Sequence, residues 1–173
     1  PLARPQVGDP GARSSRRGDA PVRAQVPLRD AYRLLNHGPT TLVTTCAVDG
    51  TRANVMAAAW AMPIDFEPAR VAVVVASGTL TRELLDENPE FVLSLPTVAQ
   101  AEATYRVGTR SGREMAKWGP GGFLPETASR VRPPLVTGCV GWLECRALDE
   151  SRLKSQYDLV LAEVLAAWAD DEV

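Results

Sequence analysis

The chain of 173 residues is long enough for one domain with a hydrophobic core, and its 45% hydrophobic and 23% charged residues are typical of globular proteins. A formal net charge of −2 argues against general affinity for nucleic acid or anionic membranes, which needs a basic surface. Because no apolar run is long enough to cross a bilayer and no secretion-signal pattern opens the chain, we expect a cytoplasmic protein.

The N-terminal part differs in composition from the rest. Residues 1–25 are rich in Pro, Gly, Ser and Arg, and they hold too few large apolar side chains to offset the entropy of ordering. We expect a flexible arm there, and its arginines fit a solvated extension better than a tail for nucleic acid or a partner. Residues 26–173 form the predicted domain, which opens with a helix over 27–38.

The middle of the chain predicts a sheet interrupted by helices. Residues 40–48 and 51–62 are β-rich and flank Asp49–Gly50, a two-residue hairpin signal. Further strands are predicted over 69–77 and 90–96, with a short helix over 78–89 between them. After these come a helix over 98–108, a glycine-rich polar loop over 109–122 and a strand over 136–148. Residues 157–169 favour a helix by propensity alone.

One stretch of the second predicted strand, NVMAAAW at 54–60, is short of side-chain volume. Strand alternation places Val55, Ala57 and Ala59 on one face, and Asn54, Met56, Ala58 and Trp60 on the other. Alanine fills a pleated sheet poorly. Such small side chains allow either close packing of a neighbouring strand or helix, or the close approach of a flat ligand to the backbone.

Cysteine and histidine do not indicate a metal or redox centre. Cys46, Cys139 and Cys145 form no CxxC pair, and we interpret them as small core residues rather than disulfide partners or thiol ligands. His37 cannot build a zinc site alone, and its place in LNHGPT favours a helix-end or turn role over catalysis.

Six segments in order resemble the flavin reductase-like FMN-binding split-barrel family, especially its flavoredoxin branch: NHGPTTLVTT, DGTRANVMAAAW, SGTLTRELL, EFVLSLP, SGREMAKW and PPLVTGCVGWLECRAL. The resemblance implies a mainly β fold with flanking helices, a six-stranded antiparallel Greek-key split barrel. It also makes residues 157–169 a late barrel strand, against propensity. The chain ends before the further strand or tail of relatives, which leaves open whether a C-terminal part of the domain is missing.

The same resemblance implies an FMN site with no metal and no catalytic side chain. Peptide groups of the alanine-rich strand would meet the polar edge of the flavin ring, while SGTLT would hold the phosphate at a helix N-terminus. The residues so implied are Asn54, Val55, Met56, Ala57, Ala58, Ala59, Trp60, Ser77, Gly78, Thr79, Leu80, Thr81, Ser111 and Lys117.

Simpler roles stay open for several of these residues. The threonines of SGTLT also suit plain N-capping, Lys117 suits a solvated loop, and Trp60 either shelters the ring or belongs to the core. Many relatives carry a basic or imidazole residue at the position of Leu80, and Arg82 is a candidate to replace that charge.

The function that the resemblance implies is an NAD(P)H-dependent flavin oxidoreductase. NADH or NADPH would be the co-substrate, and hydride would pass from nicotinamide to flavin N5. Alternatives are a flavoredoxin-type electron carrier with bound FMN and a protein redox partner, or a non-catalytic barrel that serves as a binding module. We also expect a homodimer, and for a flavin reductase a partner monooxygenase or redox protein.

Overall fold

The structure, a computed structural model, describes residues 38–170. The arm expected over 1–25, the helix expected over 27–38 except for its last residue, and His37 therefore lie outside the described residues, as do 171–173. Among the described residues no helix is long and apolar enough to span a membrane, and no group of three or more His, Cys, Asp and Glu side chains is placed to hold a metal ion.

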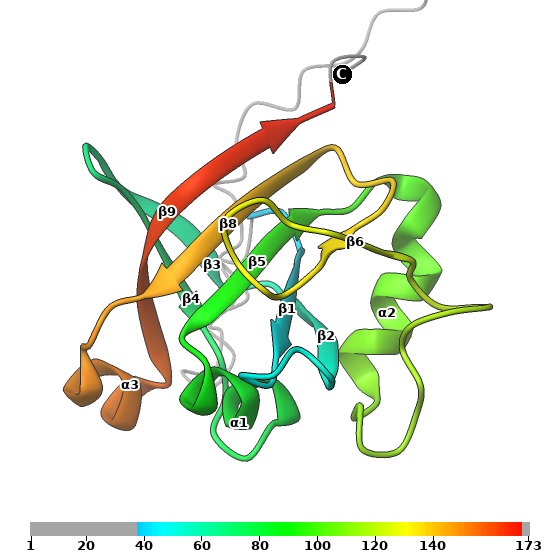
Figure 1. Ribbon diagram of the computed structural model, residues 1–173, viewed down its shortest axis with the longest axis horizontal. Coiled ribbons are helices and arrows are strands. Elements are labelled where there is room, and N and C mark those ends of the chain that lie inside the picture. Colours follow the sequence, from blue (N-terminus) through cyan, green and yellow to red (C-terminus); the bar gives the residue numbers. More distant parts are fainter. Residues whose placement is uncertain (1–37, 171–173) are drawn as a thin grey trace, which may run out of the picture. The chain divides into compact units, whose positions relative to one another are not determined.

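In the described part of the chain, an antiparallel sheet of seven strands forms the body of the domain (Figure 1), in the order β2-β1-β5-β8-β9-β4-β3. A two-stranded ribbon, β6 with β7, is added to it. Strands adjacent in sequence are often not neighbours in the sheet, since β4 pairs with β9 and β5 with β1. The strands are β1 (Thr41–Cys46), β2 (Ala53–Ala58), β3 (Ala61–Phe66), β4 (Ala69–Val74), β5 (Glu90–Leu95), β6 (Pro125–Glu126), β7 (Leu135–Val136), β8 (Gly141–Ala147) and β9 (Leu159–Ala169).

The two edges of this sheet are joined by one short link. β2 is one edge strand and β3 the other, yet only Ala59 and Trp60 separate them in the chain. The sheet must therefore curl until its edges meet, which gives a barrel. Side chains from six of the seven strands share one interior cluster with α1, including Val43, Phe91 and Cys145. The predicted split barrel is confirmed, and the sheet has seven strands rather than six because the segment 53–66 serves both edges as β2 and β3.

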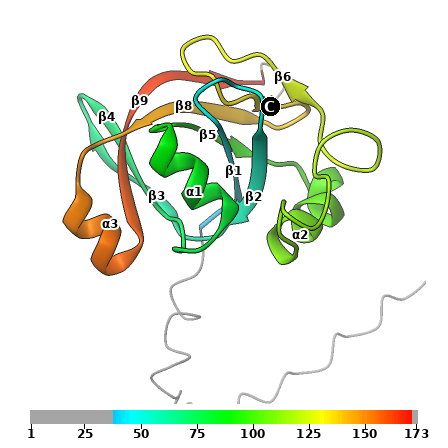
Figure 2. The ribbon, with the colours of Figure 1, turned by 60° about the horizontal axis from the view of Figure 1, so that its bottom comes forward.

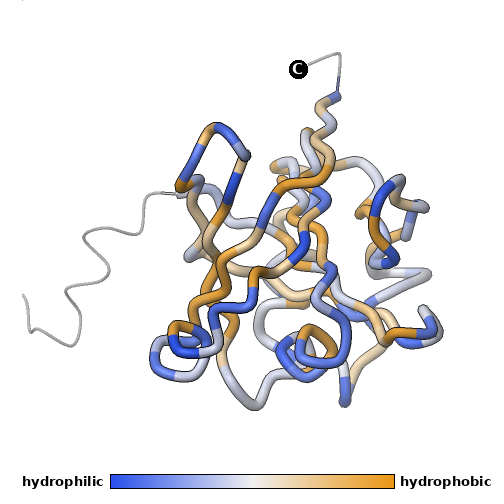
Figure 3. Tube along the Cα trace, turned by 60° about the vertical axis from the view of Figure 1, so that its left-hand side comes forward, coloured by the Kyte–Doolittle hydropathy of each residue, from blue (hydrophilic) through white to orange (hydrophobic). Residues whose placement is uncertain are grey.

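Within residues 38–170, three α-helices flank the barrel: α1 (Leu80–Glu87), α2 (Ala101–Thr109) and α3 (Ser151–Tyr157). Figure 2 shows α1 within the curve of the sheet, where Leu84 and Leu85 are buried. The 3-10 turn η2 (Val98–Gln100) leads into α2, which packs on the outer face of β2. Figure 3 shows hydrophobic residues concentrated along the barrel strands and hydrophilic ones along projecting turns and helices.

Several elements differ from the expectations in an instructive way. β9 is a strand although leucine and alanine favour helix, because it pairs along most of its length with β8 and with β4. α3 and β3 were not expected: α3 is short and polar, and β3 contains Pro63 and is mostly exposed.

The Asp49–Gly50 hairpin is confirmed, but its turn is longer than two residues, because Ala47 N–H donates to the Arg52 carbonyl. All three cysteines are buried thiols, as predicted.

Candidate functional site

A cavity of about 400 Å³ lies where the edge strand β2, the start of α1, the end of α2 and the loop after α2 come together. Its volume falls within the range of small-molecule sites, about 300–1,000 Å³. Segments that are more than fifty residues apart in the sequence thus meet in one place. The cavity collects these residues of the predicted flavin site: Asn54, Met56, Ala57, Gly78, Thr79, Leu80, Thr81, Ser111 and Lys117.

The other predicted residues lie elsewhere. Val55 is buried beneath α2 and Ala58 belongs to the barrel interior. Ala59 lines a neighbouring groove, and Ser77 lies in a separate surface depression, where its N–H donates to Asp158 Oδ1. Trp60 is 50% exposed at the break between β2 and β3, so the core interpretation of this residue is wrong.

The outer edge of β2 offers backbone groups to the cavity. The Ala53 carbonyl accepts a hydrogen bond from Trp118 Nε1 at 3.1 Å, and the Val55 carbonyl accepts one from Lys117 Nζ at 2.8 Å. In an antiparallel pair, alternate residues turn their N–H and C=O away from the partner strand. Ala57 is therefore the next residue whose peptide groups face outward, and its side chain is one methyl group. The small side chain of Ala57 also allows α2 to pack closely on β2, because a Cβ on Gly108 of α2 would lie 3.0 Å from Ala57 Cβ.

The N-terminus of α1 forms the opposite wall. Thr79 is its N-cap: the Thr79 hydroxyl accepts from Arg82 N–H at 3.2 Å and donates to the Ala76 carbonyl at 2.8 Å. N-capping is thus confirmed for Thr79, and its hydroxyl proton is already in use. The first two amides of α1, at Leu80 and Thr81, have no carbonyl four residues earlier in the helix to bind, so they can donate to an anion.

Thr81 is held in a buried hydrogen bond with β2. Asn54, 3% exposed, donates from Nδ2 to Thr81 Oγ1 at 2.8 Å. The Thr81 hydroxyl accepts in this bond, so its own proton is left to donate. A Cβ on Gly112 would lie 2.1 Å from Asn54 Oδ1 and 3.0 Å from Leu80 Cδ2. The glycine of the SGR step is therefore required for space, which sequence reasoning missed because Asn54 is far away in the chain.

Lys117 is a buried cation rather than a solvated one, so the solvated-loop interpretation is wrong. Its side chain reaches from the loop to two carbonyls, Val55 of β2 and Val107 of α2, with both Nζ–O distances 2.8 Å. The residue is 5% exposed, and burial lowers the pKa of the Lys117 ammonium from 10.5 to about 8. At pH 7 it is still mostly protonated, so it places one positive charge in the wall of the cavity.

The arginine that lines the cavity beside the start of α1 is Arg113 and not Arg82. Arg82 turns its guanidinium to the Val75 and Lys154 carbonyls and to Asp158, away from the cavity, so the expectation that it replaces a basic residue at Leu80 is wrong. Arg113 lines the cavity instead, with Nη1 3.1 Å from the Gly78 carbonyl and Nη2 2.6 Å from Glu83 Oε2. Hydrogen bonds from Arg113, and then from Arg52, lower the pKa of Glu83. Sequence spacing alone did not reveal that Arg113 folds back onto Gly78.

The sequence was compared with models of known protein families and with known proteins, and these comparisons agree on one family. The model of the flavin reductase like domain matches residues 33–173. The uncharacterized protein YddH of Escherichia coli is 43% identical over 149 residues, which are 86% of this chain and 79% of YddH.

Solved structures agree with that family. An FMN-binding domain of a flavin reductases-like enzyme from Shewanella baltica has a TM-score of 0.74 and 43% identity, covering 87% of this chain and 78% of its own. A flavoredoxin of Desulfovibrio vulgaris is more distant, with a TM-score of 0.70 and 26% identity over 78% of this chain and 71% of its own. The comparisons therefore support the family as a whole and only a distant relation to flavoredoxins.

Proposed function

This chain belongs to the flavin reductase-like domain family, and we propose that it binds FMN and acts as an NAD(P)H-dependent flavin oxidoreductase. One observation carries the proposal: a single cavity joins the free edge of β2 at Ala57 to the open amides at the N-terminus of α1. FMN has a flat ring with a polar edge at one end and a dianionic phosphate at the other. The two walls offer the matching donors.

The donors of the cavity fit a phosphate at the α1 end. Thr81 has a free hydroxyl proton, because its oxygen already accepts from Asn54. The Leu80 and Thr81 amides lie at the positive end of the helix dipole, and Arg113 adds a guanidinium beside Gly78. Thr79 acts indirectly, because its hydroxyl fixes the helix start rather than facing the ligand.

The β2 end fits the ring. Ala57 presents its peptide N–H and C=O behind a single methyl group, and Met56 and Val107 add apolar surface. Lys117 holds β2 against α2, so the edge that meets the ring is fixed before the ligand arrives. Its ammonium also favours negative charge in the cavity.

When bound, FMN would supply the two-electron chemistry, with NADH or NADPH as the hydride donor. The residues of this chain contribute binding, orientation and a fixed positive charge, and the mechanism assigns none of them a proton-transfer role. The acidic side chain that lines the cavity, Glu114, is exposed on the loop after α2.

The test is anaerobic reduction of FMN by the purified protein. Absorption near the flavin maximum should bleach when NADH or NADPH is added with catalytic amounts of protein. If FMN binds but neither nucleotide bleaches it, the reductase assignment is wrong and FMN binding stands.

The 26% identity to a flavoredoxin favours a second candidate, an electron carrier with tightly bound FMN. That function predicts slow oxidation of nicotinamide and retention of FMN through gel filtration. Rapid turnover of free flavin would count against it.

A further inference from the structure

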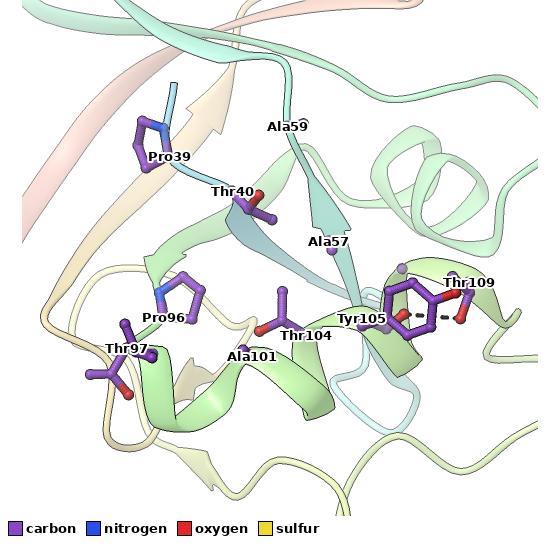
Figure 4. A pocket seen from close by; sticks show the side chains of 12 residues that line it. Pro39, Thr40, Ala57, Ala59, Pro96, Thr97, Ala101, Thr104, Tyr105 and Thr109 are labelled. Atoms are coloured by element: carbon purple, nitrogen blue, oxygen red, sulfur yellow. Dashed lines mark hydrogen bonds between the residues drawn. The ribbon is translucent and has the colours of Figure 1, made fainter. Parts of the chain in front are cut away.

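Two hollows adjoin the flavin cavity, and their walls differ in charge. The groove along α2 (Figure 4) meets the cavity at Ala57 and Gly108, and the side chains that line it are uncharged. The second hollow is a surface depression of about 480 Å³ beside α1, which meets the cavity at Gly78, Thr79 and Arg113. Charged side chains line this depression: Arg82, Glu83, Asp86, Glu87 and Arg113. The α1 end of the cavity therefore adjoins a charged surface.

Arg113 stands at the boundary between the cavity and the depression, because its side chain lines both. Its Nη1 lies 3.1 Å from the Gly78 carbonyl oxygen and its Nη2 lies 2.6 Å from Glu83 Oε2. The side chain thus reaches from the loop after α2 across to α1. On the barrel side the same end of the cavity is closed by Thr81 and Asn54, which are 1% and 3% exposed. A ligand that extends outward from the start of α1 must therefore pass Arg113.

Glu83 holds Arg113 in this position and is itself held by a second arginine. Arg52, just before β2, donates from Nη2 to Glu83 Oε1 at 2.9 Å, so each carboxylate oxygen of Glu83 binds one guanidinium. We call Arg113, Glu83 and Arg52 the arginine bridge. It joins the β1–β2 hairpin, α1 and the loop after α2 through one carboxylate, and it closes the outer side of the α1 end.

The charges beyond the bridge do not favour a further anion. Three carboxylates line the depression, those of Glu83, Asp86 and Glu87. Arg82 lines it too, but its guanidinium is already paired with Asp86 at 3.2 Å and with Asp158 at 3.1 Å. A phosphate placed in the depression would lie beside this negative charge and would have to compete with ion pairs that are already formed.

We propose that the arginine bridge selects the flavin: the site takes FMN, which ends at its first phosphate, in preference to flavin adenine dinucleotide (FAD), which continues into a second phosphate and adenosine. This inference rests on the proposed FMN site and adds the residues that distinguish the two flavins. Arg113 meets the phosphate, and Glu83 is a positioning residue that holds Arg113 across the end of the cavity. The side chains of the bridge are 42–51% exposed, so it is displaceable, and we expect a preference rather than exclusion.

Calorimetric titration of FMN and FAD into the purified protein measures the preference directly. We expect wild type to bind FMN at least ten-fold more tightly than FAD. Glu83→Gln keeps the size of the side chain and removes the ionic partner of Arg113, so the preference should fall below about three-fold, mainly through tighter FAD binding. The variant should melt close to wild type, because exposed ion pairs contribute little to stability.

The matched control is Glu87→Gln, which removes the same charge from the same depression. Glu87 pairs with Arg52 at 3.6 Å, whereas Glu83 binds Arg113 directly. The control should keep the wild-type preference to within two-fold. An equal fall in both variants would assign the preference to general repulsion by the depression and overturn the role of the bridge.

Two further results would overturn the inference. One is equal affinity of wild type for FMN and FAD. The other is a change by the same factor for both flavins in Glu83→Gln, which is what a purely structural role predicts. Failure of the proposed function is distinguishable, because binding is measured without nicotinamide. If FMN binds with the expected preference but is not reduced, the reductase assignment alone is wrong, and if neither flavin binds, the FMN site itself is wrong.

Discussion

Replacing Gly112 by alanine should disrupt the site at its centre. The new Cβ would lie 2.1 Å from Asn54 Oδ1 and 3.1 Å from Asn54 Cγ, far closer than carbon and oxygen allow. Asn54 is buried between β2 and α1 and has no room to shift without losing its hydrogen bond to Thr81 Oγ1. The substitution therefore separates the two walls of the flavin cavity.

The expected loss of stability follows from these contacts. A lost hydrogen bond costs about 1 kcal/mol, and a buried amide left unsatisfied costs about 1–3 kcal/mol more. The lower unfolded-state entropy of alanine returns about 0.4–1 kcal/mol. The net loss is about 1–3.5 kcal/mol, which lowers the melting temperature by roughly 3–12 °C for a domain of this size.

The assay combines thermal unfolding with titration of FMN by flavin fluorescence. The matched control is Gly141→Ala, whose Cβ would find its nearest neighbours, Trp168 O and Leu95 Cδ1, at 3.5 and 3.7 Å. We expect Gly112→Ala to melt lower and to bind FMN at least ten-fold more weakly, while Gly141→Ala resembles wild type. Equal melting temperatures and FMN affinities in the two variants would refute this account of Gly112.

Three further predictions concern the walls of the flavin cavity. Thr81→Val removes a hydrogen-bond donor to the phosphate and also the acceptor of the Asn54 amide, so it should weaken FMN binding roughly 10–100-fold; riboflavin, which lacks the phosphate, should lose less affinity in the same fluorescence titration, and equal losses for the two flavins would contradict a phosphate contact at Thr81. Arg113→Gln should weaken FMN binding several-fold at low salt, and calorimetry should show the difference shrinking at high salt; a difference independent of salt would contradict an electrostatic role. The pKa of Lys117 is about 8 in the folded protein and 10.5 in the unfolded chain. The buried ammonium therefore destabilises the folded protein below pH 8, and this penalty is relieved as the pH rises from about 8 to 10.5. The unfolding free energy of wild type minus that of Lys117→Met should therefore rise by up to about 3 kcal/mol across this window in denaturant titrations, and a flat difference would contradict the burial. Taking the difference matters, because Cys139 and Cys145 have raised pKa values and shift stability in the opposite direction at alkaline pH.

Much of the fold could be predicted from local signals. The β-branched runs of β1 and β4, the apolar run of β5 and the cap of α1 at Thr79 are determined by neighbours in sequence. β9 could not be predicted from propensity, because its strand form depends on β4 and β8 pairing along its two sides. β3 was missed because Pro63 argues against a strand, and an edge position tolerates it.

The site divides in the same way. The capped start of α1 could be predicted from SGTLT, and the alanines of β2 indicated a closely packed segment. Two features depend on contacts across the fold: Gly112 against Asn54, and Arg113 rather than Arg82 beside Gly78. No spacing rule links these pairs, because the loop after α2 is positioned by Lys117 reaching β2 and α2.

The most direct measurement is a crystal structure of the protein grown with FMN. We expect the phosphate to bind the Leu80 and Thr81 amides and the Thr81 hydroxyl, and the polar edge of the ring to lie against the Ala57 peptide groups. A flavin bound elsewhere, or a cavity filled by Met56 and Leu80 with the ring excluded, would contradict it.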